Sequence, residues 1–418
     1  MRAFAILLSL MGGAAFLVEE AWSTTIHVPG DYSTIYAALD AASSGDIVEV
    51  APGTYDQFDT RPSWWYGGNV SAVGFLKDGV TLQSSGGPAV TTLRLDSSTA
   101  KPVILIGDSG ELNVTGFSFT GSVGDLIAIA VQTSDGPGAL NLHNCIIRDY
   151  GVAGPKTHES AIDTYNVAVD IQDCLFANID SPTTVAVYFY GGQAIVEDCS
   201  FKNCSGGSIS FATVNDPDES LIVRRSFFEN NGYDITADRI SSLIVEDSWM
   251  AGNSAGIYSE AANVAVRNCT LAGGHGMSCQ AAHAEFTGNT FYNGSNAIQF
   301  FGYGAPSSVL FERNIFSFCT GEPAVQVGFV VIGSVTTSCN VFWQNAGENT
   351  QGYSLGPTDL IADPQFCGAP AQDFTLYGSS PCLPQNNNGC GQIGAWGFGC
   401  GPVSVEPSSW GQIKALYR

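Results

Sequence analysis

The sequence predicts an all-β solenoid, and three observations support that prediction. A short run of alternating apolar and polar residues, clearest in "AIVEDCSFKNC" at Ala194–Cys204, recurs at intervals of 20 to 29 residues. No helical segment recurs with it. Gly is abundant at 49 residues, while charged residues make up only 13% of the chain. A period in the twenties is typical of coils that stack, because one coil cannot bury its apolar face alone. We therefore expect a right-handed parallel β-helix of about 10 to 12 coils.

The first strand of each coil is marked by one position that recurs in every copy. Side chains alternate across a strand, so residues at this position should all face the interior and stack from coil to coil. Asn or Gly usually follows, and both tolerate the backbone of a sharp corner. We interpret the cysteines among them as small core residues. The position is occupied by Phe117, Cys145, Cys174, Cys199, Ser226, Ser248, Cys269, Asn289, Asn314 and Asn340.

A second strand recurs further along each coil, and its residues fall into three columns. The inward column is Ile129, Ile162, Val187, Ile209, Ile235, Ile257, Met277, Ile298 and Val325. The first outward column is Ala130, Asp163, Tyr188, Ser210, Thr236, Tyr258, Ser278, Gln299 and Gln326. The second outward column is Gln132, Tyr165, Tyr190, Ala212, Asp238, Glu260, Gln280, Phe301 and Gly328. One exterior face should therefore carry tyrosines, acids and amides.

Both ends of such a stack need protection, because unpaired strands at an open end invite aggregation. Near the N-terminus, "STIYAALDAA" places Ile35, Ala38, Leu39 and Ala42 on one helical face. This spacing predicts a helix that covers the first coil. At the other end, the Cys-rich stretch after Asp363 is expected to close the stack.

The chain is expected to be exported. Residues 1–23 contain one Arg, an apolar run at Ala3–Val18 and a small-x-small sequence ending at Ser23, which together are typical of a signal peptide. The run is shorter than the about 20 residues that a membrane span needs, and no other long apolar run exists. We expect a protein that is secreted or held at the cell surface, without a membrane span in the mature chain.

Twelve cysteines in an exported chain invite disulfides. Cys367, Cys382, Cys390 and Cys400 lie in a stretch rich in Gly, Pro and Asn with little periodicity. These four are the predicted disulfide residues. Their pairing stays open at this point.

The expected organisation is a signal peptide at 1–23, a β-helix with its N-terminal cap at 24–362, a Cys-rich cap at 363–402 and a tail at 403–418. The tail places apolar residues on one side of a short helix, as a sorting peptide or a frayed end would. The formal net charge of −24 argues against nucleic acid as a partner, because phosphate binding needs clustered Lys and Arg.

Two segments resemble a known group of proteins. "TIHVPGDYSTIYAALDAASSGDIVEVAPGTY" at Thr25–Tyr55 looks like the opening of bacterial secreted right-handed parallel β-helix proteins of the pectin-lyase-like superfold. "ADPQFC", "DFTLYGSSPC" and "GCGQIGAWGFGC" look like the closing segment that many of them carry. With the repeats, the resemblance covers nearly all of residues 24 to 402. It implies the fold, whereas the superfold hosts lyases, hydrolases, adhesins and inert scaffolds.

The outward columns of the second strand suggest a surface that binds a polysaccharide or cell-surface glycan. Ring faces pack on sugar C–H groups, and acids and amides bond hydroxyls. The predicted glycan-binding residues are Asp163, Tyr165, Tyr188, Tyr190, Tyr258, Gln280 and Gln299. The alternative is a solvated strand face whose Tyr and Gln side chains stabilise the sheet by stacking within a column.

Three further residues are weak candidates for catalysis. Asp238 and Glu260 fall one coil apart in one column, where their carboxyls could approach the ~5–5.5 Å of a retaining glycosidase pair. "GGHGMS" resembles the Gly-His-Gly motif of polygalacturonases, which implies His275 as an active-site residue. That family's Asp-Asp pair and Arg-x-Lys are missing here, where the matching regions read "GNSAGIY" and "GSNAIQF".

A non-catalytic glycan-facing role is the leading functional prediction. A polysaccharide lyase or glycoside hydrolase acting on an acidic polysaccharide is the first alternative, and a structural or adhesin-like surface protein is the second. The sequence predicts no metal site and no cofactor, although a lyase of this superfold would need Ca²⁺ ligands on neighbouring coils.

Overall fold

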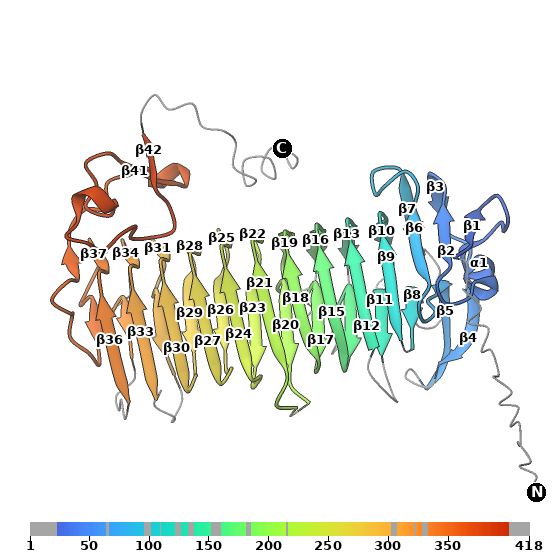
Figure 1. The fold of residues 1–418 in the computed structure, drawn as a ribbon, viewed down its shortest axis with the longest axis horizontal. Coiled ribbons are helices and arrows are strands. Elements are labelled where there is room, and N and C mark those ends of the chain that lie inside the picture. Colours follow the sequence, from blue (N-terminus) through green and yellow to red (C-terminus); the bar gives the residue numbers. More distant parts are fainter. Residues whose placement is uncertain are drawn as a thin grey trace, which may run out of the picture.

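The computed structural model describes residues 23–400 except 64–66, 96–101, 109, 122–126, 133–137, 152–159, 181–184, 215, 302–306, 322 and 328–332. The expected signal peptide, apart from Ser23, and the expected tail at 403–418 lie outside the described residues. Three sheets of 13 strands each run side by side along a stack of about 13 coils (Figure 1).

Sheet A consists of the first strand of each coil, and each strand is parallel to its neighbours in the sheet. Its strands are β1 (Thr25–Val28), β2 (Ile47–Val50), β6 (Thr81–Ser84), β9 (Glu111–Thr115), β12 (Gly138–His143), β15 (Val167–Gln172), β18 (Gln193–Glu197), β21 (Ser220–Arg224), β24 (Ser242–Glu246), β27 (Asn263–Arg267), β30 (His283–Thr287), β33 (Ser308–Glu312) and β36 (Ser334–Ser338).

Sheet B begins at the corner beyond sheet A and is also parallel throughout. Its strands are β3 (Gly53–Tyr55), β7 (Thr91–Arg94), β10 (Ser118–Gly121), β13 (Ile146–Gly151), β16 (Leu175–Asp180), β19 (Ser200–Cys204), β22 (Phe227–Glu229), β25 (Trp249–Ala251), β28 (Thr270–Ala272), β31 (Thr290–Tyr292), β34 (Ile315–Ser317), β37 (Val341–Trp343) and β39 (Leu360–Ile361).

Sheet C carries the residues predicted to face a ligand. Only its first pair, β4 with β5, is antiparallel. Its strands are β4 (Asp59–Ser63), β5 (Gly68–Phe75), β8 (Pro102–Gly107), β11 (Ile127–Gln132), β14 (Ile162–Tyr165), β17 (Val187–Tyr190), β20 (Ile209–Ala212), β23 (Tyr233–Asp238), β26 (Ala255–Ser259), β29 (His275–Cys279), β32 (Ile298–Phe300), β35 (Val325–Gln326) and β38 (Thr350–Gln351).

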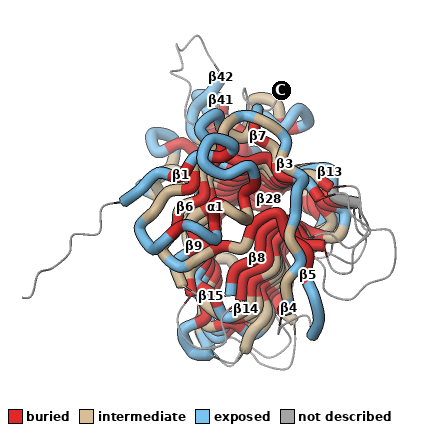
Figure 2. The backbone as a smooth tube through the Cα atoms, turned by 90° about the vertical axis from the view of Figure 1, so that its right-hand side faces the viewer, coloured by how far each residue is buried: buried red, intermediate tan, exposed pale blue. Residues whose placement is uncertain are grey.

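The interior is a single apolar column that all three sheets enclose (Figure 2). The predicted inward column of sheet C pairs residue for residue, from Ile129 opposite Ile162 to Ile298 opposite Val325. Every member of that column is at most 2% exposed. Phenylalanines stack from coil to coil as well, with the rings of Phe176 and Phe201 4.7 Å apart. Alternation along each strand therefore sets the fold, and the exact apolar residue is free to vary.

A polar column runs inside the corner between sheets A and B, at the recurring position predicted from the sequence. Cys145, Cys174 and Cys199 are buried free thiols there, as expected. Further along, Asn314 Oδ1 accepts a hydrogen bond from the Asn289 backbone N–H at 3.0 Å, and Asn314 Nδ2 donates to the Phe286 carbonyl at 2.7 Å. Each buried amide thus satisfies backbone groups that the corner leaves without partners.

The N-terminal end is closed by the predicted helix α1 (Ile35–Ala41). Thr34 is its N-cap, because the Thr34 hydroxyl accepts from the Ala37 backbone N–H at 3.4 Å. Ile35 and Leu39 are buried against the first coils, where they lie beside Gly74 of β5. This cap is confirmed.

The C-terminal end of the interior is closed by the segment that follows β37. Tyr353 packs against the main core, and its ring stacks on Phe311 at 5.3 Å. Leu355 packs there too. Asp359 finishes the polar column, because its carboxylate accepts hydrogen bonds from the Asn340 backbone N–H and from the Asn340 side chain, both at 2.9 Å.

The sequence predicts that the Cys-rich stretch closes the end of the stack, whereas in the structure it packs along the side of the β-helix (Figure 1). It forms a small sheet of β40 (Phe366–Gly368), β41 (Asp373–Tyr377) and β42 (Phe398–Cys400), with two 3-10 turns at Ala369–Ala371 and Pro384–Asn386.

This small sheet lies against the outer face of sheet B. Phe374 of β41 packs on Trp249 with ring centroids 5.5 Å apart. The Trp396 indole donates to the Thr270 hydroxyl at 2.7 Å. The exterior of sheet B carries aromatic residues over these coils, and they need a cover that no coil of the solenoid provides.

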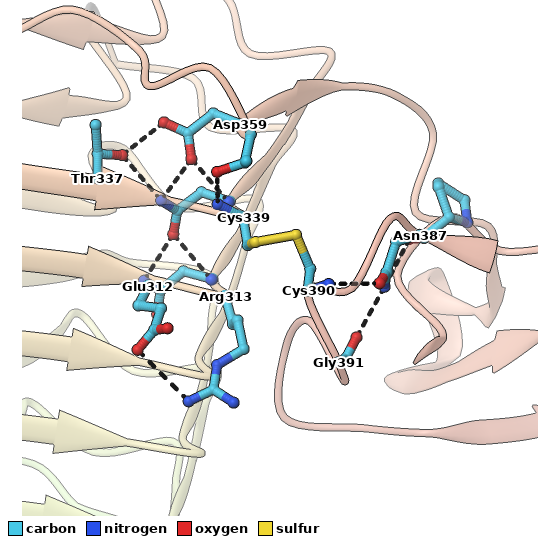
Figure 3. The surroundings of a disulfide bond; sticks show 12 residues. Glu312, Arg313, Thr337, Cys339, Asp359, Asn387, Cys390 and Gly391 are labelled. Atoms are coloured by element: carbon cyan, nitrogen blue, oxygen red, sulfur yellow. Dashed lines mark hydrogen bonds and ion pairs between the residues drawn. A yellow bond between two sulfur atoms is a disulfide. The ribbon is translucent and has the colours of Figure 1, made fainter. Parts of the chain in front are cut away.

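The disulfide prediction is right for three of its four cysteines. Cys367 pairs with Cys400, and Cys390 pairs with Cys339. Cys382 was predicted to be oxidised, but it is a buried free thiol packed among apolar residues. Figure 3 shows the Cys339–Cys390 bond, which ties the small sheet to the corner beyond β36 beside Asp359. Within the described residues, no helix is long and apolar enough to cross a membrane.

Candidate functional site

The two predicted outward columns lie on the exterior of sheet C in the expected register. Asp163 pairs with Tyr188, and Tyr165 pairs with Tyr190. In the next coil the matching residues are Ser210 and Ala212. Parallel strands keep equivalent residues one above another, so each column presents a continuous row of side chains to the outside.

Three tyrosines form one stacked group, which we call the tyrosine ridge: Tyr165, Tyr188 and Tyr190. The rings of Tyr165 and Tyr190 stack with centroids 5.1 Å apart, and those of Tyr188 and Tyr190 lie 6.4 Å apart. All three are half-buried, so each keeps part of its surface open to solvent. Neighbouring rings that support one another are rigid, and a rigid aromatic surface loses little entropy when it binds.

A second aromatic pair stands further along the same face. The Tyr258 and Phe301 rings stack with centroids 5.1 Å apart. Small residues, Ser210 and Thr236, occupy the first outward column between the ridge and this pair. Three strand steps separate Tyr188 from Tyr258, which is about 14 Å. The face thus carries two raised aromatic areas with a lower stretch between them.

Asp163 stands beside the ridge, and among the described residues no cation contributes to the shift of its pKa. Burial is what raises the pKa of its carboxyl, to about 7. Its negative charge in turn adds to the burial that raises the pKa of Tyr188. A carboxyl group that titrates near neutral pH is more typical of a binding or reacting group than of a solvated surface acid.

A small pocket opens where the ridge meets an apolar patch on the N-terminal part of sheet C. We call it the Gln132 pocket. It is lined by Ile106, Gly107, Asp108, Ala130, Val131, Gln132, Asp163 and Tyr165. The apolar patch is a buried cluster that consists of Val70, Ala72, Val103, Ile106, Ile127 and Ala130. The sequence placed Gln132 in the outward column, but the pocket itself depends on three successive coils and was not foreseen.

Asp238 and Glu260 do not have the environment of a catalytic pair. Asp238 accepts two hydrogen bonds from Arg239, at 3.0 and 3.1 Å, and this contact is the main reason its pKa is lowered. Glu260 accepts from the Tyr258 hydroxyl at 2.6 Å. Arg239, the next residue along the chain, stabilises the ionised form of Asp238, so this carboxyl lacks the raised pKa that an acid catalyst requires.

His275 sits on β29 among hydroxyl groups rather than acids. Its ring nitrogens lie 3.0 Å from the Ser295 hydroxyl and 2.8 Å from the Ser278 hydroxyl. Burial lowers the pKa of His275, which favours the neutral ring. A neutral imidazole held by two serines has a complete structural role and needs no substrate to explain it.

The two predicted glutamines differ from the tyrosines in their contacts. Gln299 donates to the Gln326 side chain at 3.1 Å, so it takes part in stacking within its column. Gln280 is half-buried at the end of β29. The alternative interpretation, stabilisation by column stacking, therefore describes Gln299 better than ligand binding does.

The part of the chain that the structure describes offers no ready set of metal ligands. No group of three or more His, Cys, Asp and Glu residues there could hold a metal ion. Two carboxyls, Asp108 and Asp163, line the Gln132 pocket. A role for Ca²⁺ stays a possibility raised by the sequence.

Comparison with protein families identifies the fold. A family model described as "Right handed beta helix region" matches residues 160–316. The chain is a right-handed β-helix. About 13 coils of it are present, slightly more than the sequence predicted. A search of curated proteins finds no match to this β-helix.

Solved structures support the same fold at low identity. A mutant of a PL6-family alginate lyase is 14% identical, with a TM-score of 0.50, and the match covers 92% of this chain and 60% of that one. The catalytic domain of a GH87 α-1,3-glucanase, bound to tetrasaccharides, is 8% identical with a TM-score of 0.50, and covers 82% and 68%.

A third structure, a pectate lyase, is 14% identical with a TM-score of 0.45 and covers 87% of this chain and 90% of that one. The β-helix spans 54% and 60% of two alginate lyase chains among its matches. Likeness at these identities shows the architecture alone.

Proposed function

We propose that this β-helix binds a polysaccharide along the exterior of sheet C, and that the tyrosine ridge is the principal contact. The observation that carries the proposal is the stacked, partly open arrangement of Tyr165, Tyr188 and Tyr190. Sugar rings present C–H faces that pack on aromatic faces, and the polar groups beside the ridge suit their hydroxyls. The alginate lyases and the α-1,3-glucanase on the same architecture act on polysaccharides, which agrees with this proposal.

The direction of the ligand follows from the spacing of the aromatic areas. The ridge and the Tyr258–Phe301 pair lie in the same two columns, about 14 Å apart. A polysaccharide chain lying parallel to the stack would contact both areas and cross the small residues between them. A chain lying along the strands, at right angles to the stack, would reach only one.

A binding role rather than catalysis is favoured by the environment of the sequence candidates. Asp238 is neutralised by Arg239, Glu260 is occupied by Tyr258, and His275 is held by two serines. A general acid needs a carboxyl group whose pKa is raised toward the working pH, whereas that of Asp238 is lowered.

The test replaces Tyr188 and Tyr190 together by Ala and measures retention on immobilised and soluble polysaccharides. We expect affinity to fall at least tenfold, since losing two contact rings should cost more than about 1.4 kcal/mol. Tyr377→Ala is the matched control, because Tyr377 is 49% exposed but lies on β41. Unchanged retention by the double variant would refute the ridge, and absence of binding by the wild type would favour a scaffold or adhesin.

Catalysis is kept as a second candidate because of Asp163 alone. A carboxyl with a pKa of about 7 beside an open aromatic surface matches what general acid–base catalysis requires near neutral pH. If the protein cleaves polysaccharide, Asp163→Asn should abolish the release of reducing ends or unsaturated products while retention persists. Loss of turnover in Asp238→Asn or Glu260→Gln instead would point back to the pair proposed from the sequence.

A further inference from the structure

The Gln132 pocket contains a buried polar group that has no partner in the described structure. Gln132 is only 6% exposed, and its Nε2 makes no hydrogen bond there. An unsatisfied buried amide donor costs about 1 to 3 kcal/mol, so such a group is retained where something else satisfies it. The pocket that Gln132 lines is open to the exterior of sheet C and adjoins the tyrosine ridge through Tyr165.

The other described residues of the lining supply acceptors and no cation. Asp108 and Asp163 are the charged residues that line the pocket, and among its described lining residues there is no Lys, Arg or His. Asp163 is partly buried, whereas Asp108 is more exposed at its side of the pocket. The pocket therefore offers one N–H donor together with carboxyl groups that can accept.

This combination distinguishes between three kinds of sugar substituent. A hydroxyl group can accept from the Gln132 amide and donate to a carboxylate at the same time, so it satisfies both. Where Asp163 is ionised, above its pKa of about 7, the carboxylate of a uronic acid would bring a further negative charge against Asp108 and Asp163, and none of the described lining residues is a cation that could offset it. The ammonium of an amino sugar would suit the carboxylates but cannot accept from Gln132.

We propose that the Gln132 pocket binds a hydroxyl group of an uncharged sugar, and that the surface is therefore specific for neutral polysaccharides. This inference rests on the proposed function, because the pocket is taken as one subsite of the same binding surface. It goes beyond that function by naming the charge class of the ligand. It also differs from the acidic polysaccharide considered as an alternative from the sequence.

The ridge and the pocket have separate tasks in this proposal. Stacking on Tyr165 and its neighbours depends on the shape of the sugar ring and is nearly indifferent to its charge. Specificity comes from the pocket, because the Gln132 amide is already desolvated in the free protein. A ligand that leaves this donor unpaired therefore gains no hydrogen bond from it.

The experiment compares soluble neutral glucan, mannan and xylan with alginate and polygalacturonate by affinity electrophoresis, in EDTA and in CaCl₂. We expect wild-type protein to be retarded by at least one neutral polymer and by neither acidic one. Gln132→Met, which removes the donor and keeps the length of the side chain, should weaken neutral-polymer binding about tenfold, the loss of one good hydrogen bond. Gln193→Met on sheet A, where Gln193 bonds the Asp218 carbonyl, is the control and should bind as wild type.

The outcomes separate this inference from the function on which it rests. Binding of alginate or polygalacturonate that is weakened by the double Tyr188/Tyr190 variant but unaffected by Gln132→Met would overturn neutral specificity and leave the ridge standing. Acidic binding only in CaCl₂ would overturn it too, in favour of a cation bridge at Asp108 and Asp163. Should Gln132→Met fail to fold, Asp108→Leu, which removes an acceptor at the more exposed side, tests the same pocket, and unchanged neutral-polymer affinity would refute the proposal.

Discussion

Replacing Asp163 by Asn should stabilise the protein at alkaline pH. Burial raises the pKa of this carboxyl from 3.8 to about 7, so the folded protein holds a proton that the unfolded chain has already lost. The stability linked to the protonated form is complete below pH 3.8 and disappears as the pH rises toward 7. Above that pH, the folded state carries an uncompensated charge that an amide would not carry.

The size of the effect follows from the shift. A difference of about three pKa units corresponds to about 4 kcal/mol, and this is an upper value because Asp163 is only partly buried. Asp163→Asn should therefore raise the free energy of unfolding by up to about 4 kcal/mol at pH 8.5. At pH 4 the change should be near zero, since an amide closely resembles a protonated carboxyl in size and polarity.

Urea denaturation of wild type and variant at both pH values measures the difference. Asp238→Asn is the matched control, because contact with Arg239 lowers the pKa of Asp238. A group whose pKa is lowered by folding stabilises the folded protein at pH values above its unfolded pKa, and this stability is lost as the pH falls. The control should therefore lose stability at pH 8.5, the opposite sign. An Asp163→Asn variant that is equally or less stable than wild type at pH 8.5 would show that its carboxyl is solvated or paired, and the reasoning would fail.

Three further outcomes are expected. Asn314→Ala should lower the free energy of unfolding by about 2 to 4 kcal/mol in denaturation experiments, because it leaves buried amide and carbonyl groups without partners; an unchanged midpoint would contradict the role given to the polar column. Cys339→Ser removes a link that spans 51 residues, worth up to about 4 kcal/mol of chain entropy, so limited proteolysis should release the Cys-rich stretch first. Mass-spectrometric mapping should find Cys382 alkylated after denaturation without reductant, and Cys367 only with it; the reverse would refute the pairing.

The arrangement of sheet C could be predicted from the sequence because a strand has a period of two and a coil repeats. Placing Ile162, Val187 and Ile209 in register was enough to place Asp163 and Tyr188 outside, opposite each other. The 6.4 Å separation of the Tyr188 and Tyr190 rings is close to the spacing of alternate residues on a strand. Local geometry alone fixes such relations.

Features that depend on distant partners could not be predicted in the same way. The Gln132 pocket depends on the volumes of residues on three coils, of which Gly107 and Ala130 are the small ones. The partner of Cys390 is Cys339, which belongs to the repeats by sequence and lies near the Cys-rich stretch only in space. The effect of Arg239 on Asp238 depends on a side-chain direction that alternation does not fix.

The position of the small C-terminal sheet bears on how the protein is made. Phe227, Trp249 and Tyr292 lie on the outside of coils in the second half of the helix, and Phe374 and Trp396, which pack with them, are among the last described residues of the chain. A nascent polypeptide can stack these coils as they emerge, yet it keeps an exposed aromatic flank until the Cys-rich stretch has been made. A chain without the Cys-rich stretch would thus be prone to self-association through this aromatic flank rather than forming a shorter, well-dispersed rod.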